Sequence, residues 1–274
     1  MAVTNLDELK SVLFRDAKQW WFYSNVCGAG VLVLGIIVLV TNQGNVFFAL
    51  GTGVFVGATA YLRWISDNKK GVAETVTRRF EMNDGLGWAV DERELREIVT
   101  DGPNEAEAAL ATDKFRDYYA SSSGIGLLRM LENLEESARW SKRLSKEVSD
   151  WVFWGTGIVI ALAIVSLILA LRSTVALSLA DRIGQVVITM FIFLFSDGYL
   201  RLAFDYRAFA NKARDVELLA GAMTKRASIN EADAITLLND YQVARAQSPL
   251  IPESLYKRAS KRLNALEQKR DSKK

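Results

Sequence analysis

The chain has 274 residues, of which 50% are hydrophobic and 24% charged, and its formal net charge is +2. So small a net charge argues against a general electrostatic attraction to nucleic acid, and we expect neither DNA nor RNA as a partner. Histidine is absent and Cys27 is the single cysteine, which excludes a disulfide framework, a thiolate metal cluster and a histidine general base.

The first part of the chain predicts a transmembrane hairpin over residues 20–64. A charged amphipathic helix is expected over residues 1–19, and apolar runs follow over residues 20–40 and 46–64. Each run is close to the ~20 residues that a helix needs to cross ~30 Å of hydrocarbon. Because the second run follows at once, the first is not expected to be a cleaved signal peptide.

Residues 65–150 are predicted to form a helical insert between two hairpins. Near its end Leu127, Leu131 and Leu134 recur at spacings of three and four, which indicates an amphipathic helix. We expect this helix to continue without a break into the next apolar run.

The second half predicts another hairpin over residues 151–204, from apolar runs at 151–171 and 184–204. Residues 205–274 are predicted to form a helical tail whose first helix continues the fourth span. The tail ends in YKRASKRLNALEQKRDSKK, with eight basic and two acidic residues. This end is either a basic helix on anionic lipid head groups or a solvated tail.

Lysine and arginine counts orient the chain. The TNQGN turn has none and the link at 172–183 has two, whereas residues 67–150 have thirteen and residues 205–274 have fourteen. By the positive-inside rule, both termini and the insert are cytoplasmic. The predicted fold is therefore an all-α polytopic protein of the bacterial inner membrane, with two hairpins and a cytoplasmic helical domain formed by the insert and the tail.

Two features inside the predicted spans are candidates for packing or gating. Gly53 and Gly57 are four apart, the spacing that lets helices approach closely in lipid, although glycine is also common in ordinary spans. Asp197 lies in the fourth run with Arg201 four residues on, which places both on one helix face.

Three interpretations of Asp197 compete: a proton or ion relay, a structural salt bridge with Arg201 near the cytoplasmic interface, and a gating pair in an oligomer. A relay usually needs carboxylates in several helices, and the other runs contain none. Asp197 lies ~10 Å from the inner end of its run, which favours an ionic latch over a transport site.

Basic residues of the insert are candidates for binding a phosphate-bearing ligand, since guanidinium groups pair with phosphate and tryptophan stacks on bases. These candidates are Arg78, Arg79, Arg139, Lys142 and Arg143, with Trp140 beside the last three. The alternative is a set of exposed helix charges, with Glu135 pairing Arg139 at i to i+4.

The sequence contains no motif for catalysis. It lacks a nucleophile elbow, a P-loop, HExxH and a metal-ligand cluster, so we expect neither an enzyme nor a bound metal or cofactor.

Four segments resemble the SMODS-associated four-transmembrane effector family, which accompanies nucleotidyltransferases that make cyclic oligonucleotides in CBASS anti-phage systems. They are FRDAKQWWFYSN, AETVTRRFEMNDGLGW, RDYYASS with LENLEESARWSKRL, and LLNDYQVARAQSPLIPESLYKR. Positions in the last segment that resemble the family pattern are Arg245, Pro249, Pro252 and Tyr256. Glu81 stands where the family tends to have aspartate, and Trp88, which ends the second segment, joins the ligand candidates.

The resemblance implies an antiviral effector that oligomerises and permeabilises the inner membrane when a cyclic oligonucleotide from a partner nucleotidyltransferase appears, as in abortive infection. It brings no catalytic residues. The alternative is a non-conducting membrane scaffold that docks a soluble partner through its cytoplasmic helices. The two differ in liposome leakage, because a scaffold releases no dye.

Overall fold

The computed structural model describes residues 5–41, 46–111, 118–172, 184, 186–187, 198–259 and 262, and every regular element within these ranges is an α-helix. The helices are α1 (Leu6–Thr41), α2 (Val46–Leu86), α3 (Glu92–Thr100), α4 (Glu105–Leu110), α5 (Leu127–Arg172), α7 (Tyr199–Met223) and α8 (Glu231–Gln247), and residues 253–259 are also helical. Three of them, α1, α2 and α5, are long and apolar enough to cross a membrane. The predicted all-α class is therefore confirmed for the described residues.

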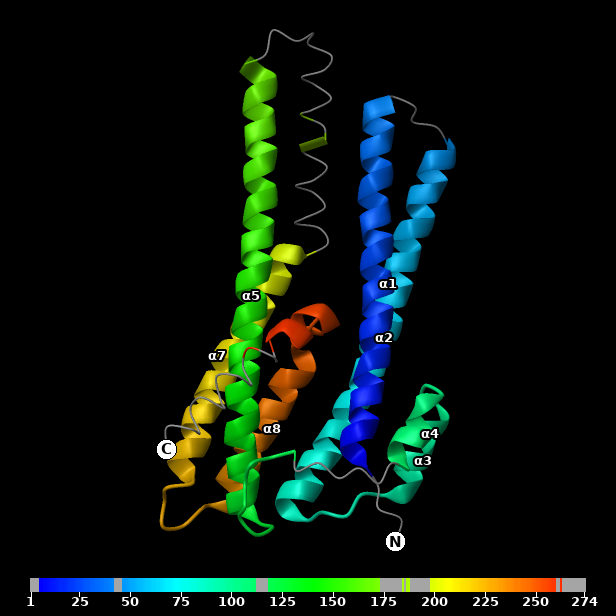
Figure 1. Ribbon diagram of the computed structural model, residues 1–274. Coiled ribbons are helices and arrows are strands. Elements are labelled where there is room, and N and C mark those ends of the chain that lie inside the picture. The colour runs from blue at the N-terminus through cyan, green and yellow to red at the C-terminus, as the bar shows by residue number, and fades with distance from the viewer. Residues whose placement is uncertain are drawn as a thin grey trace.

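Helices α1 and α2 lie side by side along most of their length (Figure 1). At the charged end of the pair, Leu9 and Leu13 pack with Val76 in a core that α3 and α4 close from the outside. At the apolar end, a Cβ on Gly30 would lie 2.9 Å from the Phe55 ring. Gly30 thus lets the Phe55 ring of α2 pack against the backbone of α1, a role that the sequence did not reveal.

The second group of helices consists of α5, α7 and α8. Their shared core contains Leu131 and Leu134 of α5, Val216 of α7, and Leu238 and Tyr241 of α8. Leu131 and Leu134 are two of the residues whose spacing predicted an amphipathic helix. The predicted continuation of this helix into the third apolar run is confirmed, because α5 runs unbroken for 46 residues.

From Tyr199 onward the last residues of the fourth apolar run continue into the tail as one helix, as predicted. Helix α7 begins at Tyr199, directly after Gly198, whose φ of 72° is left-handed. Such a φ is accessible to glycine and incompatible with a right-handed helix. Most of the fourth run, including Asp197, lies outside the described residues.

The apolar parts of the long helices are poorly covered by the chain itself. None of the most apolar 18-residue stretch of α2 is buried, and only 11% of that stretch in α1 is buried. Exposed side chains include Phe47 and Trp154, with exposed fractions of 82% and 74%. Surfaces of this kind mark contact with lipid or with another protein chain.

The two helical groups meet where α2 ends. A Cβ on Gly85 would lie 3.0 Å from both Cα and Cβ of Met130 on α5, and the Gly126 amide donates to the Gly85 carbonyl at 2.8 Å. Arg129 and Asn133 donate to the Asp84 carboxylate at 2.9 Å and 2.6 Å. We call this contact the α2–α5 junction.

Candidate functional site

A buried ionic network joins α2 to α8. The Nε atom of Arg245 donates to Glu74 at 2.9 Å, and its terminal nitrogens both donate to Glu81, one of them at 3.2 Å. Gln242 donates to the same Glu81 carboxylate at 2.9 Å. These four residues form the α2–α8 network, and their side chains are almost fully enclosed.

Helix periodicity explains why these side chains meet. Glu74 and Glu81 are seven residues apart, or about two turns, so they lie on one face of α2. Gln242 and Arg245 are three apart and share a face of α8. One planar guanidinium can therefore span two carboxylates on the neighbouring helix.

The electrostatics of the network favour the charged form of Arg245. Burial alone lowers the pKa of Arg245, but the carboxylates of Glu81 and Glu74 outweigh it and hold that pKa well above its usual value. Removal of the guanidinium would leave two carboxylates without their main partner inside the protein.

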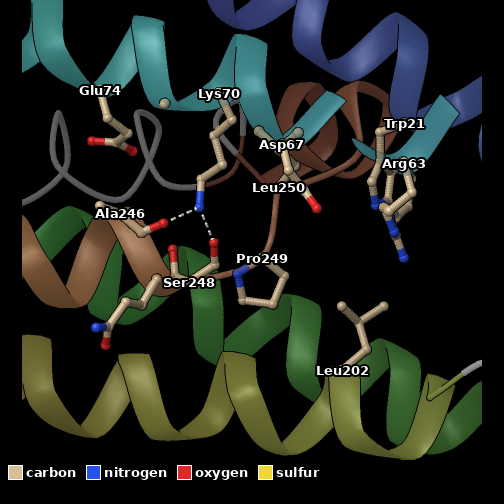
Figure 2. Close-up of a pocket in the computed structure, with 12 residues that line it drawn as sticks. Trp21, Arg63, Asp67, Lys70, Glu74, Leu202, Ala246, Ser248, Pro249 and Leu250 are labelled. Atoms are coloured by element: carbon tan, nitrogen blue, oxygen red, sulfur yellow. Dashed lines mark hydrogen bonds between the residues drawn. The ribbon is translucent and has the colours of Figure 1, made fainter. Parts of the chain in front are cut away.

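Lys70 fastens the end of α8 to α2 one turn from Glu74. Its Nζ donates to the carbonyls of Ala246, at 2.6 Å, and Ser248, as Figure 2 shows. The last carbonyls of a helix have no partner within the helix, so a lysine there satisfies them and complements the helix dipole. Lys70 therefore extends the contact between α2 and α8 beyond the network.

An aromatic cluster lies beside the network. The Tyr119 ring stacks on Phe80 of α2 with centroids 6.0 Å apart, and Ser137 of α5 donates to the Tyr119 hydroxyl at 3.2 Å. Tyr118 meets the same phenylalanine edge-on, and Lys10 of α1 lies 3.5 Å from the centroid of the Tyr118 ring. This pair of tyrosines thus contacts α1, α2 and α5 together.

The helical segment 253–259 also connects the two groups. Lys18 of α1 donates to Glu253 at 2.8 Å and lies over the Tyr256 ring. On the other side, Arg258 lies over the Trp151 ring of α5, 4.7 Å from its centroid. The contacts of this segment with α1 are therefore polar or cation–π.

A cavity of about 300 Å³ lies next to the network, between α1, α2, α7 and the chain that follows α8 (Figure 2). Trp21 and Arg63 line one end of it and Glu74 lies near the other. Leu202 of α7 and Leu250 contribute apolar surface. The cavity is thus lined by residues of both helical groups.

The structure separates the basic candidates into two sets. Arg79 is exposed and pairs with Glu94 of α3 at 2.9 Å, and Trp88 is exposed after the end of α2. Arg78 is half-buried, and its Nε has no hydrogen-bond partner within the described part of the chain. These three residues belong to the α1–α2 group.

The second set lies on α5 and is turned toward α7. Arg139 and Lys142 both bind Glu217, and Arg139 also pairs with Glu135, the i to i+4 pair weighed from the sequence. Trp140 packs in an apolar cluster with neighbours from α5 and α7, and Arg143 is half-buried on the same helix. The two sets thus lie in different helical groups.

The packing and gating candidates have different surroundings. Gly53 and Gly57 face open space, because no atom lies within 4 Å of a Cβ built on either residue. The Arg201 side chain is 86% exposed and lies 3.8 Å from Asp205, while its proposed partner Asp197 is outside the described residues.

The α2–α8 network was not predicted as a site, although Glu81 and Arg245 both stand in segments quoted for the family resemblance. The sequence signal for this network was the spacing of Glu74 and Glu81, which are seven residues apart on one helix, together with Arg245 in a distant segment. No protein-family model, curated protein or solved structure matches the chain. The function is therefore argued from the residues alone.

Proposed function

We propose that the protein is an effector of a CBASS-like antiviral system, which oligomerises and permeabilises the bacterial inner membrane when a cyclic oligonucleotide appears. The observation that carries the proposal is the continuity of α2 and α5, each of which runs unbroken from an uncovered apolar half into a charged half. Any rearrangement of the charged halves would move the apolar halves with them.

The proposed topology has four spans in two hairpins, with both termini and the charged bundle in the cytoplasm. The lysine and arginine counts support this orientation. The bundle then faces the compartment in which a partner nucleotidyltransferase would release its product.

The proposed mechanism is a separation of the two helical groups. At the α2–α5 junction, Met82 and Leu86 of α2 pack against the core of the second group. The α2–α8 network, Lys70 and the Lys18–Glu253 pair cross between the groups through polar contacts. Polar groups that separate can bind water or a ligand, so their parting costs less than exposure of an apolar core. The ligand must bind the separated arrangement more tightly than the joined one.

Several copies are needed for a conducting path. Four helices pack around side chains and leave no aqueous hole, and the apolar faces are uncovered within one chain. The open surface at Gly53 and Gly57 suits close packing against a helix of another copy.

The ligand site is assigned to the charged bundle. Arg78 is its best candidate, because its Nε is buried and has no partner among the described residues, with Arg79 and Trp88 nearby on the same group. Arg139 and Lys142 would first have to release Glu217.

The test is dye release from liposomes that contain the purified full-length protein. A panel of cyclic di- and trinucleotides is added at saturating concentration, and we expect one of them to trigger release while linear nucleotides do not. Release by none would contradict the proposal and leave the scaffold that docks a soluble partner. Co-expression with an active nucleotidyltransferase, with growth and dye entry as readouts, repeats the test in cells.

A further inference from the structure

The cavity beside the network lies where the apolar run of α2 gives way to charged residues. Arg63 falls within that run, one residue before its end, and Trp21 lies near the start of the apolar run of α1. Tryptophan is enriched at this level in membrane helices, where the head groups of the bilayer lie. Under the proposed topology, the cavity therefore lies at the level of the phospholipid head groups.

Two residues of opposite charge, Arg63 and Asp67, line the cavity beside Trp21 and Lys70. The Arg63 guanidinium stacks over the Trp21 ring, 5.6 Å from its centroid, and Asp67 follows one turn later. Among the residues that the structure describes, neither Arg63 nor Asp67 has an oppositely charged group within 4 Å. Lys70, the other cation of the cavity, already donates to the carbonyls of Ala246 and Ser248.

A zwitterion with one anionic and one cationic group complements this arrangement. An arginine fork binds phosphate oxygens in pairs, and a carboxylate accepts hydrogen bonds from an ammonium group. A volume of about 300 Å³ is at the lower limit for small-molecule pockets, so it suits a head group better than a whole cyclic oligonucleotide. Leu202 and Leu250 supply the apolar wall that a glycerol backbone would meet.

We propose that this cavity binds the head group of phosphatidylethanolamine, with its phosphodiester on Arg63 and its ammonium on Asp67. The lipid would then bridge the two helical groups, because α2 supplies both charges and α7 supplies an apolar wall. The inference rests on the proposed membrane topology but not on the proposed permeabilisation, since lipid binding requires no trigger.

The test measures phospholipid retained by the full-length protein after gel filtration in detergent, with equal amounts of phosphatidylethanolamine, phosphatidylcholine and phosphatidylglycerol supplied. We expect about one phosphatidylethanolamine per chain in preference to the other two, as for a single defined site. Arg63→Gln should lower the affinity for this lipid about tenfold or more, through loss of the paired phosphate contact. Asp67→Asn should abolish the preference among the three lipids while leaving the phosphodiester contact in place.

The matched control is Arg96→Gln, which removes the same charge from an exposed site on α3 and should leave retention unchanged. Circular dichroism and gel filtration confirm that each variant is folded, and Arg63→Lys, which keeps the charge, should retain intermediate affinity. Soluble glycerophosphoethanolamine should compete for the site. Equal retention of the three lipids, or retention unaffected by Arg63→Gln, would overturn the inference.

The same protein is titrated with the cyclic nucleotide panel. Nucleotide binding that requires Arg63, without preferential lipid retention, would assign the phosphodiester site to the nucleotide and overturn the lipid proposal. A protein that releases dye normally but retains no phosphatidylethanolamine contradicts this inference alone. Retention without triggered release contradicts the proposed function alone.

Discussion

Arg245 and Glu74 lie 171 residues apart in the chain, yet the arginine Nε is 2.9 Å from the glutamate Oε2. The pair is enclosed, with exposed fractions of 15% and 5% for the two side chains. It therefore differs from an exposed salt bridge, whose removal has little effect on stability.

Replacement of Arg245 should be strongly destabilising. Arg245→Gln leaves the two carboxylates of the network without their guanidinium, and loss of one member of a buried ion pair costs about 3–5 kcal/mol. Thermal or denaturant unfolding in detergent measures the effect. Arg96→Gln is the control, because Arg96 and Glu92 form an exposed pair with exposed fractions of 75% and 74%, and should change little. A triple variant that also carries Glu74→Gln and Glu81→Gln should recover part of the loss, and equal effects of Arg245→Gln and Arg96→Gln would contradict the role of burial.

Gly85 should tolerate no side chain at the α2–α5 junction. In Gly85→Ala the new Cβ would lie 3.0 Å from the backbone of Met130, so α2 and α5 must shift apart. Overpacking of this kind costs about 1–3 kcal/mol. Gly71→Ala is the matched control on the same helix, because no atom lies within 4 Å of its Cβ, and it should stabilise α2 by about 0.5–1 kcal/mol. Opposite signs in unfolding measurements are expected, and a stabilising Gly85→Ala would show that the junction is looser than described.

Stability should fall in strongly alkaline solution because of Tyr241. Burial raises the pKa of this phenol to about 12, while the unfolded chain ionises near its ordinary value of 10. Below pH 10 both states keep the proton, so the contribution is fully present. As the pH rises from 10 to 12 the unfolded state loses its proton first, and roughly 2–3 kcal/mol of stability is lost. Tyr241→Phe should flatten this part of the stability profile, and an unchanged slope would assign the alkaline loss to other groups.

The Lys18–Glu253 pair should influence how readily the two helical groups separate. The Lys18 ammonium lies 2.8 Å from the Glu253 carboxylate, and Lys18→Glu would replace this ion pair by two like charges. Under the proposed function, dye release should then occur at a lower nucleotide concentration. Glu253 is 42% exposed, so the pair contributes at most about 1 kcal/mol, and the shift should stay within about fivefold. The exchanged double variant, with Glu253→Lys added, should restore the original concentration dependence. A shift that the exchange does not reverse would indicate an effect of Lys18 alone.

Assembly should depend on the open glycine face of α2. Gly57→Leu fills a surface that is empty in the single chain, so the monomer should fold normally while oligomers become smaller in crosslinking or native mass spectrometry. Gly155→Leu is the control, because Gly155 on α5 also faces open space and lacks a glycine four residues away. Equal loss of oligomers in both variants would point to a general effect of added bulk.

The fold class could be predicted because its signals are periodic and local. Leu127, Leu131 and Leu134 predicted a helix face, and the face packs as expected. The Glu135–Arg139 pair could be predicted for the same reason, since both residues belong to one helix. The second partner of Arg139, Glu217 on α7, has no spacing that would reveal it.

Contacts between distant segments could not be predicted from the sequence, and the reason is physical. A buried pair such as Glu81 and Arg245 depends on how two helices pack, and each residue alone is typical of a solvated helix face. The left-handed conformation of Gly198 was hidden because glycine occurs both in membrane helices and at left-handed positions. The close contact of Gly30 with Phe55 depends on the relative rotation of α1 and α2, which composition does not fix.

The length of α2 means that a small rotation about Gly85 would move its far end much more than its middle. Its 41 residues extend for about 60 Å, with Gly85 held against α5 near one end and Val46 at the other. Glu74 lies only about 16 Å from that fulcrum, so a 1 Å widening there would carry the Val46 end about 3–4 Å sideways. A displacement too small to unpack the bundle would thus be amplified into a movement comparable to the radius of a helix.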